Sequence, residues 1–381
     1  MVTLASKNIT VKGYLAHNLG DDLFMDTLFR RYPDVCFTVV ADGQYRFFEQ
    51  RYGNVRLIPL GSVSAQQRLL RLKARLCGTS ISEEICLLLR DIRRSHTLVM
   101  IGGSMYQQQR DERLQRQILF ETRHLYRGAL HAFVIGANFG PYWSEWYREE
   151  YQKIFTRYCD DVCFRDRWSG EQFLNTPKIR TASDVLFTFP MPKKRREKQV
   201  FLSVCDLSLS GRPTALQKRT AEYEQWLVDI SSGLCKRGYK IIFGAFCAAE
   251  NDVAAIERVR NTLVNRGIES ECLIYSEDSA PIVNVIASSE IVVSTRFHAT
   301  ILGLVAGAKV LPVIYNVKTD NMLNDLDIDI PRVDLLKSDS NEWISDIDSI
   351  VALEPIDVDK QIADAQHQFD ALDAFLGRAT S

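Results

Sequence analysis

The sequence predicts an α/β protein built from two Rossmann-like domains that face each other across a cleft. Short apolar runs rich in β-branched residues alternate with longer segments of helical spacing, which is typical of βαβ units and parallel sheets. A basic segment with two prolines, 189–198, interrupts this alternation near the middle of the chain. The length of 381 residues gives room for two or three domains.

The first half contains five segments with the pattern of buried strands, separated by helical patterns. The helix expected at 21–31 opens with two acidic residues, which suit the positive end of a helix. A second helix is expected at 144–157, where aromatic residues recur at helical spacings. The expected strands are 8–16, 36–41, 97–101, 131–136 and 161–164.

The second half repeats the alternation, with strands expected at 200–204, 240–246, 291–293 and 309–314 and helices at 218–237, 250–266 and 298–306. Residues 320–381 hold 15 acidic and 4 basic residues, and a helix at 358–377 is expected to pack back on the body. The predicted organisation is an N-terminal domain at 1–190, a C-terminal domain at 199–355 and an acidic helical segment at 356–381.

Composition narrows the class of protein. A formal charge of −1 argues against a general nucleic-acid binder, and 46% hydrophobic residues argue against a disordered chain. No run of apolar residues is long enough to span a membrane, and the first ten residues lack the order of a signal peptide. Nine scattered cysteines read as reduced thiols, and none has zinc-site spacing. We therefore expect a cytoplasmic protein, and no motif in the sequence demands a metal.

One basic segment, 66–76, leaves two interpretations open. Leucines alternate there with arginines and a lysine, a composition that lays a helix on an anionic membrane surface. The same composition is found in ordinary surface helices with basic outer residues, and this second interpretation is favoured because charge patterns are weak signals. A peripheral contact with the inner face of the membrane is the alternative.

Familiar catalytic motifs are missing. The sequence has no G-x-G-x-x-G after its first strand, no P-loop, no H-E-x-x-H and no G-x-S-x-G, so nicotinamide enzymes, P-loop NTPases, zincins and typical serine hydrolases lose support. What remains is a set of strand-to-helix junctions, where open α/β sheets bind their ligands. These junctions are 17–22, 102–104, 136–141, 164–169 and 295–298.

The first three junctions are glycine-containing turns. The first, taken alone, is more often a well-capped turn than a site, and the other two are weak signals because such turns are common. The fourth ends in Arg165, whose guanidinium suits a carboxylate or phosphate, although a salt bridge with Asp166 or Glu171 explains it equally well. The fifth is more informative. Arg296 and His298 stand where a strand leads into a helix N-terminus, and Lys318 follows the next strand, so we expect an anion site there.

Taken in order, these segments resemble the polysaccharide pyruvyl transferase family over about residues 10–325. The resemblance rests on the ordered set of motifs, above all Arg-Phe-His at 296–298 followed by Tyr-x-x-Lys at 315–318. It implies a fold similar to GT-B-type glycosyltransferases and transfer of the enolpyruvyl group of phosphoenolpyruvate to a sugar, forming a pyruvate ketal. It also implies a donor side in the second domain and a sugar-acceptor side in the first.

The resemblance implies a role for each site residue. His298 is the expected general acid, with Arg296 and Arg165 as further catalytic residues, and Asp21, Asp166 and Asp184 are alternative bases. The expected donor phosphate lies at the helix N-terminus with Arg296, and its carboxylate lies near Arg165 or Lys318. The donor site would comprise Arg165, Ser294, Arg296, Phe297, His298 and Lys318, and the acceptor site Asn18, Gly20, Asp21, Gly103, Ser104 and Asn138.

Phosphoenolpyruvate would be a substrate rather than a bound cofactor, and the acceptor a nucleotide- or lipid-linked precursor of a surface polysaccharide. Two other functions stay open. One is a GT-B-type glycosyltransferase that uses a sugar nucleotide, and the other is a non-catalytic glycan-binding protein.

Overall fold

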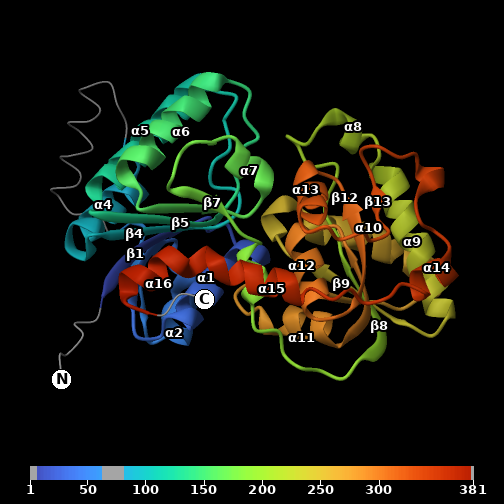
Figure 1. Ribbon diagram of the computed structural model, residues 1–381. Coiled ribbons are helices and arrows are strands. Elements are labelled where there is room, and N and C mark those ends of the chain that lie inside the picture. Colours follow the sequence, from blue (N-terminus) through green and yellow to red (C-terminus); the bar gives the residue numbers. More distant parts are fainter. Residues whose placement is uncertain (1–6, 62–80, 379–381) are drawn as a thin grey trace. The chain divides into compact units, whose positions relative to one another are not determined.

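The computed structural model describes residues 7–61 and 81–378 (Figure 1). The chain forms two compact units. Unit 1 comprises the described residues of Met1–Leu15, Phe24–Val185 and Asp364–Ser381, and unit 2 comprises Ala16–Leu23 and Leu186–Ala363. The basic segment expected to form a helix at 66–76 lies outside the described residues. In the described part of the chain, no helix has the length and apolar character needed to cross a bilayer.

Unit 1 is built on a parallel seven-stranded sheet of order β3-β2-β1-β4-β5-β6-β7. Strands β1, β2, β4, β5 and β6 are mostly buried along their length. The strands are β1 (Asn8–Gly13), β2 (Cys36–Ala41), β3 (Val55–Pro59), β4 (Thr97–Ile101), β5 (His131–Ala137), β6 (Asp161–Phe164) and β7 (Ile179–Thr181).

Helices cover both faces of this sheet. In Figure 1, α4, α5 and α6 lie on one face and α1, α2 and α16 on the other. Buried side chains of α4, α5 and α6 pack with those of β4, β5 and β6 in one hydrophobic core. The helices are α1 (Leu19–Arg31), α2 (Arg46–Arg51), α4 (Glu83–Ser95), α5 (Glu112–Gly128), α6 (Glu145–Tyr158), α7 (Arg167–Glu171) and α16 (Asp370–Leu376), with a short 3₁₀ turn at Gly43–Tyr45. A second 3₁₀ turn, Val185–Thr188, begins at the last residue of the unit 1 segment Phe24–Val185 and continues into unit 2.

Unit 2 holds a parallel six-stranded sheet of order β10-β9-β8-β11-β12-β13, the strand order of a Rossmann fold. Its core joins the central strands to α9 and α10 through apolar side chains such as Trp226 and Phe243. The strands are β8 (Glu197–Ser203), β9 (Lys240–Ala245), β10 (Glu271–Ile274), β11 (Ser289–Ser294), β12 (Lys309–Ile314) and β13 (Val333–Asp334).

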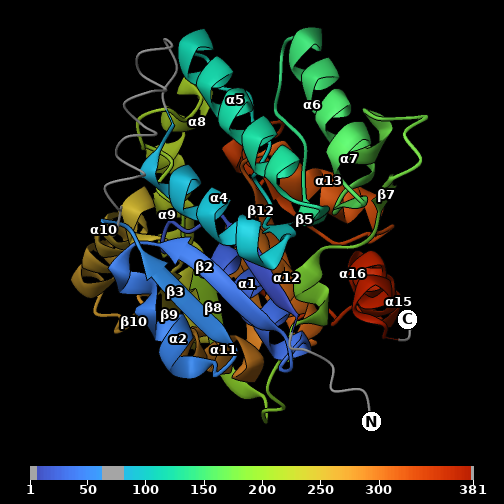
Figure 2. The ribbon, with the colours of Figure 1, turned by 90° about the vertical axis from the view of Figure 1, so that its left-hand side faces the viewer.

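The helices of unit 2 alternate with these strands along the chain. Figure 2, turned by 90°, shows β2 and β3 of unit 1 between α4 and α2. A 3₁₀ turn, Ala248–Glu250, joins β9 to α10 and carries a residue of the candidate site. The helices are α8 (Thr214–Gln217), α9 (Thr220–Lys236), α10 (Asp252–Asn265), α11 (Ala280–Ser288), α12 (Phe297–Val305), α13 (Val317–Asp325), α14 (Ile347–Val351) and α15 (Asp359–Gln366), with a further 3₁₀ turn at Ser340–Glu342.

The two units differ from the predicted domain boundaries at both ends of the chain. Residues 16–23, predicted in the first domain, belong to unit 2, because the first turn of α1 bonds to that unit: the Leu19 N–H donates to the Phe246 carbonyl (3.0 Å). Residues 364–381, predicted as a separate acidic segment, belong to unit 1, where the Arg31 guanidinium and the Tyr32 hydroxyl bond to Asp373. The helix expected at 358–377 is divided into α15, a 3₁₀ turn at His367–Phe369 and α16.

Candidate functional site

Each sheet reverses its strand order once, between β1 and β4 in unit 1 and between β8 and β11 in unit 2. In open parallel sheets, ligands bind beyond the carboxyl ends of the strands at such a point. Four of the five predicted junctions directly follow strands of these two sheets. The remaining junction, 17–22, lies between β1 and α1 in the sequence and belongs to unit 2. We therefore describe the carboxyl edge of each unit separately.

In unit 1, Arg165 is the centre of a buried polar cluster. Its guanidinium donates to the Asp184 carboxylate (2.9 Å) and to the Asn138 side-chain oxygen (3.0 Å). The side chains of Arg165 and Asp184 are only 5% and 0% exposed. Gly103 makes room for this arrangement, because a Cβ at that position would lie 2.5–2.6 Å from three guanidinium atoms. The structure thus brings Gly103, Asn138 and Arg165 together.

Two of the carboxylates considered as bases are engaged in this unit. Asp184 pairs with Arg165, as described above. Asp166 caps α7, where it accepts hydrogen bonds from the Ser169 backbone N–H and from the Ser169 hydroxyl, both at 2.8 Å. The sequence left open a salt bridge of Arg165 with Asp166 or Glu171, and the structure shows a salt bridge of Arg165 with Asp184.

In unit 2, the turn between β11 and α12 is fixed by buried hydroxyl groups. The Ser203 hydroxyl oxygen accepts hydrogen bonds from the backbone N–H groups of Thr295 and Arg296, both at 3.1 Å. Ser294, an expected donor-site residue, is fully buried, and its hydroxyl bonds to that of Thr300 (2.9 Å). These contacts hold the first turn of α12 against the ends of β8 and β11.

Arg296 is buried and paired with two carboxylates. Its Nε donates to Asp252 Oδ2 (3.0 Å), its Nη2 also bonds to Asp252, and its Nη1 donates to Glu250 Oε2 (2.7 Å). Asp252 has no exposed side-chain surface and also accepts the backbone N–H groups of Phe246 and Cys247. The sequence predicts that the charge of Arg296 binds a phosphate. In this structure, that charge is already paired with the carboxylates of Asp252 and Glu250.

His298 lies in the first turn of α12 and is partly exposed. Its imidazole packs on the backbone of Gly20: a Cβ at Gly20 would overlap the ring, with Cε1 2.7 Å away. The ring of Phe297 meets the imidazole edge-on, with centroids 5.0 Å apart. The predicted segment at 17–22 therefore lies beside His298 in unit 2.

The turn that carries Gly20 is held in place by its neighbours. The Asn18 side-chain oxygen accepts the Gly20 backbone N–H (3.0 Å) and so caps α1. Two residues after Gly20, Asp22 accepts a hydrogen bond from the Tyr275 hydroxyl (2.7 Å). Asp21 lies in the same first turn, in unit 2, and is 9% exposed.

A second arginine, Arg212, reaches the same carboxylate as Arg296. Its Nη2 donates to Glu250 Oε2 (3.2 Å), its Nε donates to the Asp206 carbonyl (2.7 Å), and its guanidinium lies 5.0 Å from the centre of the Tyr315 ring. Lys318, at the start of α13, adds a third positive charge that acts on Glu250. Burial raises the pKa of Glu250, but the three cations outweigh it and leave that pKa below its ordinary value.

The site residues fall into two groups, one in each unit. Unit 1 holds Gly103, Ser104, Asn138 and Arg165, whereas unit 2 holds Asn18, Gly20, Asp21, Ser294, Arg296, Phe297, His298 and Lys318. Sequence reasoning missed three further residues of the unit 2 site, which are Arg212, Glu250 and Asp252. Two of them could have been found from their position in the sequence, because Glu250 and Asp252 follow the carboxyl end of strand β9.

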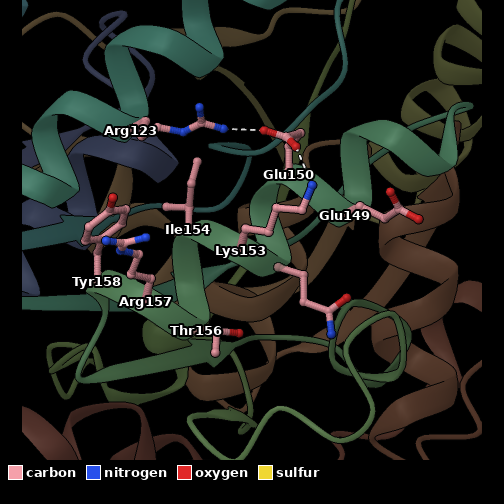
Figure 3. Close-up of a pocket in the computed structure, with 9 residues that line it drawn as sticks. Arg123, Glu149, Glu150, Lys153, Ile154, Thr156, Arg157 and Tyr158 are labelled. Atoms are coloured by element: carbon pink, nitrogen blue, oxygen red, sulfur yellow. Dashed lines mark hydrogen bonds and ion pairs between the residues drawn. The ribbon is translucent and has the colours of Figure 1, made fainter.

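No cluster of three His, Cys, Asp or Glu side chains suited to a metal ion occurs within 7–61 and 81–378. A surface hollow of about 730 Å³ occurs elsewhere, along α5 and α6 of unit 1 (Figure 3). Glu150 bonds there to both Arg123 and Lys153. None of the predicted site residues lines this hollow.

The fold places the protein in a structural class. The crystal structure of Anabaena HepE in complex with UDP-glucose is similar over 97% of this chain and 98% of its own, with a TM-score of 0.57 and 11% identity. The structure of the UDP-GlcNAc 2-epimerase from Methanocaldococcus jannaschii is similar over 92% of this chain and 93% of its own, with a TM-score of 0.58 and 8% identity. The protein thus has two Rossmann-like units of the kind found in GT-B-type glycosyltransferases and sugar-nucleotide epimerases.

Comparison of the sequence with known families is more specific than the fold. The family described as polysaccharide pyruvyl transferase matches residues 18–317, which include the Gly20 turn, the Arg165 cluster and the first turn of α12. The chain belongs to the polysaccharide pyruvyl transferase family. A search of curated proteins gives no significant match.

Proposed function

We propose that this protein transfers the enolpyruvyl group of phosphoenolpyruvate to a sugar of a polysaccharide precursor and forms a pyruvate ketal. The observation that carries the proposal is the partly exposed imidazole of His298 at the N-terminus of α12, within a chain of this family. The helix dipole and the neighbouring cations favour an anionic substrate there. An imidazole has an ordinary pKa of about 6.5, which suits proton transfer near neutral pH.

The reaction requires a proton on the methylene carbon of the donor. In the proposed mechanism, protonated His298 supplies it, and the adjacent carbon becomes electrophilic. One sugar hydroxyl forms a bond to that carbon, the bond to the phosphate oxygen breaks, and a second hydroxyl of the same sugar closes the ketal. Of the two hydroxyl protons released, one restores the imidazolium and the other leaves with the phosphate.

The candidate bases differ in their surroundings. Asp184 is fully buried against Arg165, and Asp166 caps α7, so both already serve the fold of unit 1. Asp21 lies next to Gly20, on which the His298 ring packs. Its position favours Asp21 as the base that takes up one hydroxyl proton and passes it to the departing phosphate. A direct contact of Arg165 with the donor stays a prediction, and its buried pairing also supports a positioning role.

The test combines the protein with phosphoenolpyruvate and candidate sugar precursors. Mass spectrometry should detect an acceptor heavier by one pyruvate less one water, with release of one phosphate. The His298→Gln variant should lose turnover by about 10²–10⁴-fold, as expected for loss of a general acid. His367→Gln is the matched control, because that histidine is exposed and pairs with Asp370 in unit 1. Ketal formation by the His298 variant at the wild-type rate would refute its role.

The fold supports one alternative. HepE, whose structure is similar to this chain, was crystallised with UDP-glucose, and the similar epimerase acts on UDP-GlcNAc by its name. A glycosyltransferase that uses a sugar nucleotide would therefore suit the same fold. Isothermal titration separates the two functions: binding of UDP-glucose without binding of phosphoenolpyruvate would favour the glycosyltransferase. Binding of glycan alone, with no turnover of either donor, would indicate a non-catalytic protein.

A further inference from the structure

Glu250 stands among three positive charges of unit 2. Its Oε2 accepts hydrogen bonds from Arg296 (2.7 Å) and from Arg212 (3.2 Å), and Lys318 attracts it as well. Its side chain is 35% exposed, whereas those of Arg212 and Arg296 are 13% and 7% exposed. A partly exposed carboxylate is therefore bonded to two arginines that are largely buried.

The two carboxylates near Arg296 have different surroundings. Asp252 is fully buried, binds Arg296 through both oxygens and also accepts two backbone N–H groups, so it is part of the framework. Glu250 ends a short 3₁₀ turn, and its side chain is partly exposed while it bonds to both arginines. Rotation of the Glu250 side chain would release Arg296 Nη1 and Arg212 Nη2 from their hydrogen bonds to it, while the contacts of Asp252 stay in place.

We infer that Arg212, Arg296 and Lys318 form an oxyanion pocket in which the Glu250 carboxylate occupies the position that an oxyanion of the substrate takes. This inference rests on the proposed function for the identity of the donor, because phosphoenolpyruvate supplies both a carboxylate and a phosphate. Arg212 is then a further donor-binding residue. Glu250 is an internal competitor, which the substrate displaces.

Charge explains why the competitor matters. With Glu250 in place, three cations face two carboxylates, and little positive charge remains for a substrate that bears a carboxylate and a phosphate of about −1.5 to −2. Displacement of Glu250 leaves Asp252 as the only carboxylate of this group against three cations. Arg212 and Arg296 present planar guanidinium groups, which match the geometry of carboxylate and phosphate oxygens.

The test measures anion binding by isothermal titration, with inorganic phosphate, pyruvate and phosphoenolpyruvate as separate probes. Glu250→Gln removes the competing charge at nearly constant size, so at least one probe should bind about 10-fold more tightly or better. The probe that gains most identifies which oxyanion takes the place of Glu250. Glu271→Gln is the matched control, since Glu271 pairs with Lys240 at the amino end of β10, and its affinities should equal the wild type.

A second variant tests Arg212 itself. Arg212→Lys keeps the charge but loses the planar group, so we expect about 10-fold weaker binding of the same probe. In the double variant Arg212→Lys/Glu250→Gln, the gain from Glu250→Gln should shrink, because the two residues act on one ligand. Thermal unfolding of each variant shows whether unit 2 is folded.

The outcomes separate this inference from the proposed function. Tighter binding of phosphate or pyruvate by Glu250→Gln supports the pocket even where no ketal forms, in which case the proposed function fails alone. Unchanged or weaker binding of all three probes by folded Glu250→Gln overturns the pocket, even where the wild type forms ketal.

Discussion

The imidazole of His298 rests on the backbone of Gly20, a residue 278 positions earlier in the chain, and no side chain larger than hydrogen fits between them. The backbone of Gly20 is that of an ordinary helical turn, so the glycine is required by space. The sequence predicts Gly20 on the acceptor side, and that role stays a prediction. The contact supports a further prediction, that Gly20 positions the proposed acid.

Gly20→Ala should therefore displace the His298 ring. A shift of about 1 Å in a reacting group costs about 10²-fold in rate, and we expect turnover to ketal to fall by that order. The measurement is kcat for ketal formation, together with the NMR signal of the His298 ring, which should shift. Gly43→Ala is the control, because a Cβ there meets no atom within 4 Å. Unchanged turnover with an unchanged ring signal would contradict the positioning role.

The buried pair of Arg165 and Asp184 should contribute strongly to the stability of unit 1. Asp184→Asn leaves the buried guanidinium without its charged partner, and loss of one partner of a buried pair costs about 3–5 kcal/mol. Denaturation by urea measures this change. Asp34→Asn, which removes an exposed carboxylate paired with Arg378 in the same unit, should cost no more than about 1 kcal/mol. Equal losses in the two variants would argue against the burial of the Arg165 pair.

Asp252 should determine the position of Arg296. In Asp252→Asn the side chain keeps its shape but loses its charge, so the Arg296 guanidinium turns toward Glu250, and unit 2 loses about 3–5 kcal/mol of stability. Chemical denaturation and a crystal structure of the variant check the two effects. The matched control is Asp229→Asn, since Asp229 pairs with Arg266 at the surface. An Arg296 that keeps its conformation in the variant would show that Glu250 and the helix suffice to hold it.

The lowered pKa of Glu250 gives unit 2 a pH-dependent contribution. A carboxylate whose pKa is lower in the folded than in the unfolded chain stabilises the fold above its ordinary pKa, about 4.5 for Glu250. This stabilisation is lost as the pH falls from there through the lowered folded value. Wild type should therefore be more stable than Glu250→Gln at neutral pH, and the difference should shrink in acid. A difference that does not vary with pH would show that Glu250 is unpaired in solution.

The sequence predicted the interior of both sheets better than their edges. Strands β2, β4, β6 and β12 have the predicted bounds, because they are buried runs of apolar residues. The strands that sequence analysis missed, β3, β7, β10 and β13, are the outermost strands of the two sheets. An edge strand such as β10 is largely exposed, so its residues lack the apolar run that marks a strand.

The site shows the same division. Arg296 and His298 were predictable, because they directly follow an apolar strand and open a helix. The pairing of Arg296 with Asp252, 44 residues earlier, depends on how β9 and β11 are arranged in the sheet, and sequence spacing does not reveal it. Arg212 was missed for the same reason, since its loop follows β8, two strands away from β12, which precedes Tyr315.

The first turn of α1 belongs to unit 2, while the remainder of that helix belongs to unit 1. Cleaving the polypeptide at the mid-chain prolines would therefore not yield two self-sufficient halves. The C-terminal piece would lack Gly20, on which the His298 ring packs. It would also lack Asp22, which accepts a hydrogen bond from the Tyr275 hydroxyl. Dissection at that linker should inactivate the enzyme unless both pieces are present and recombine.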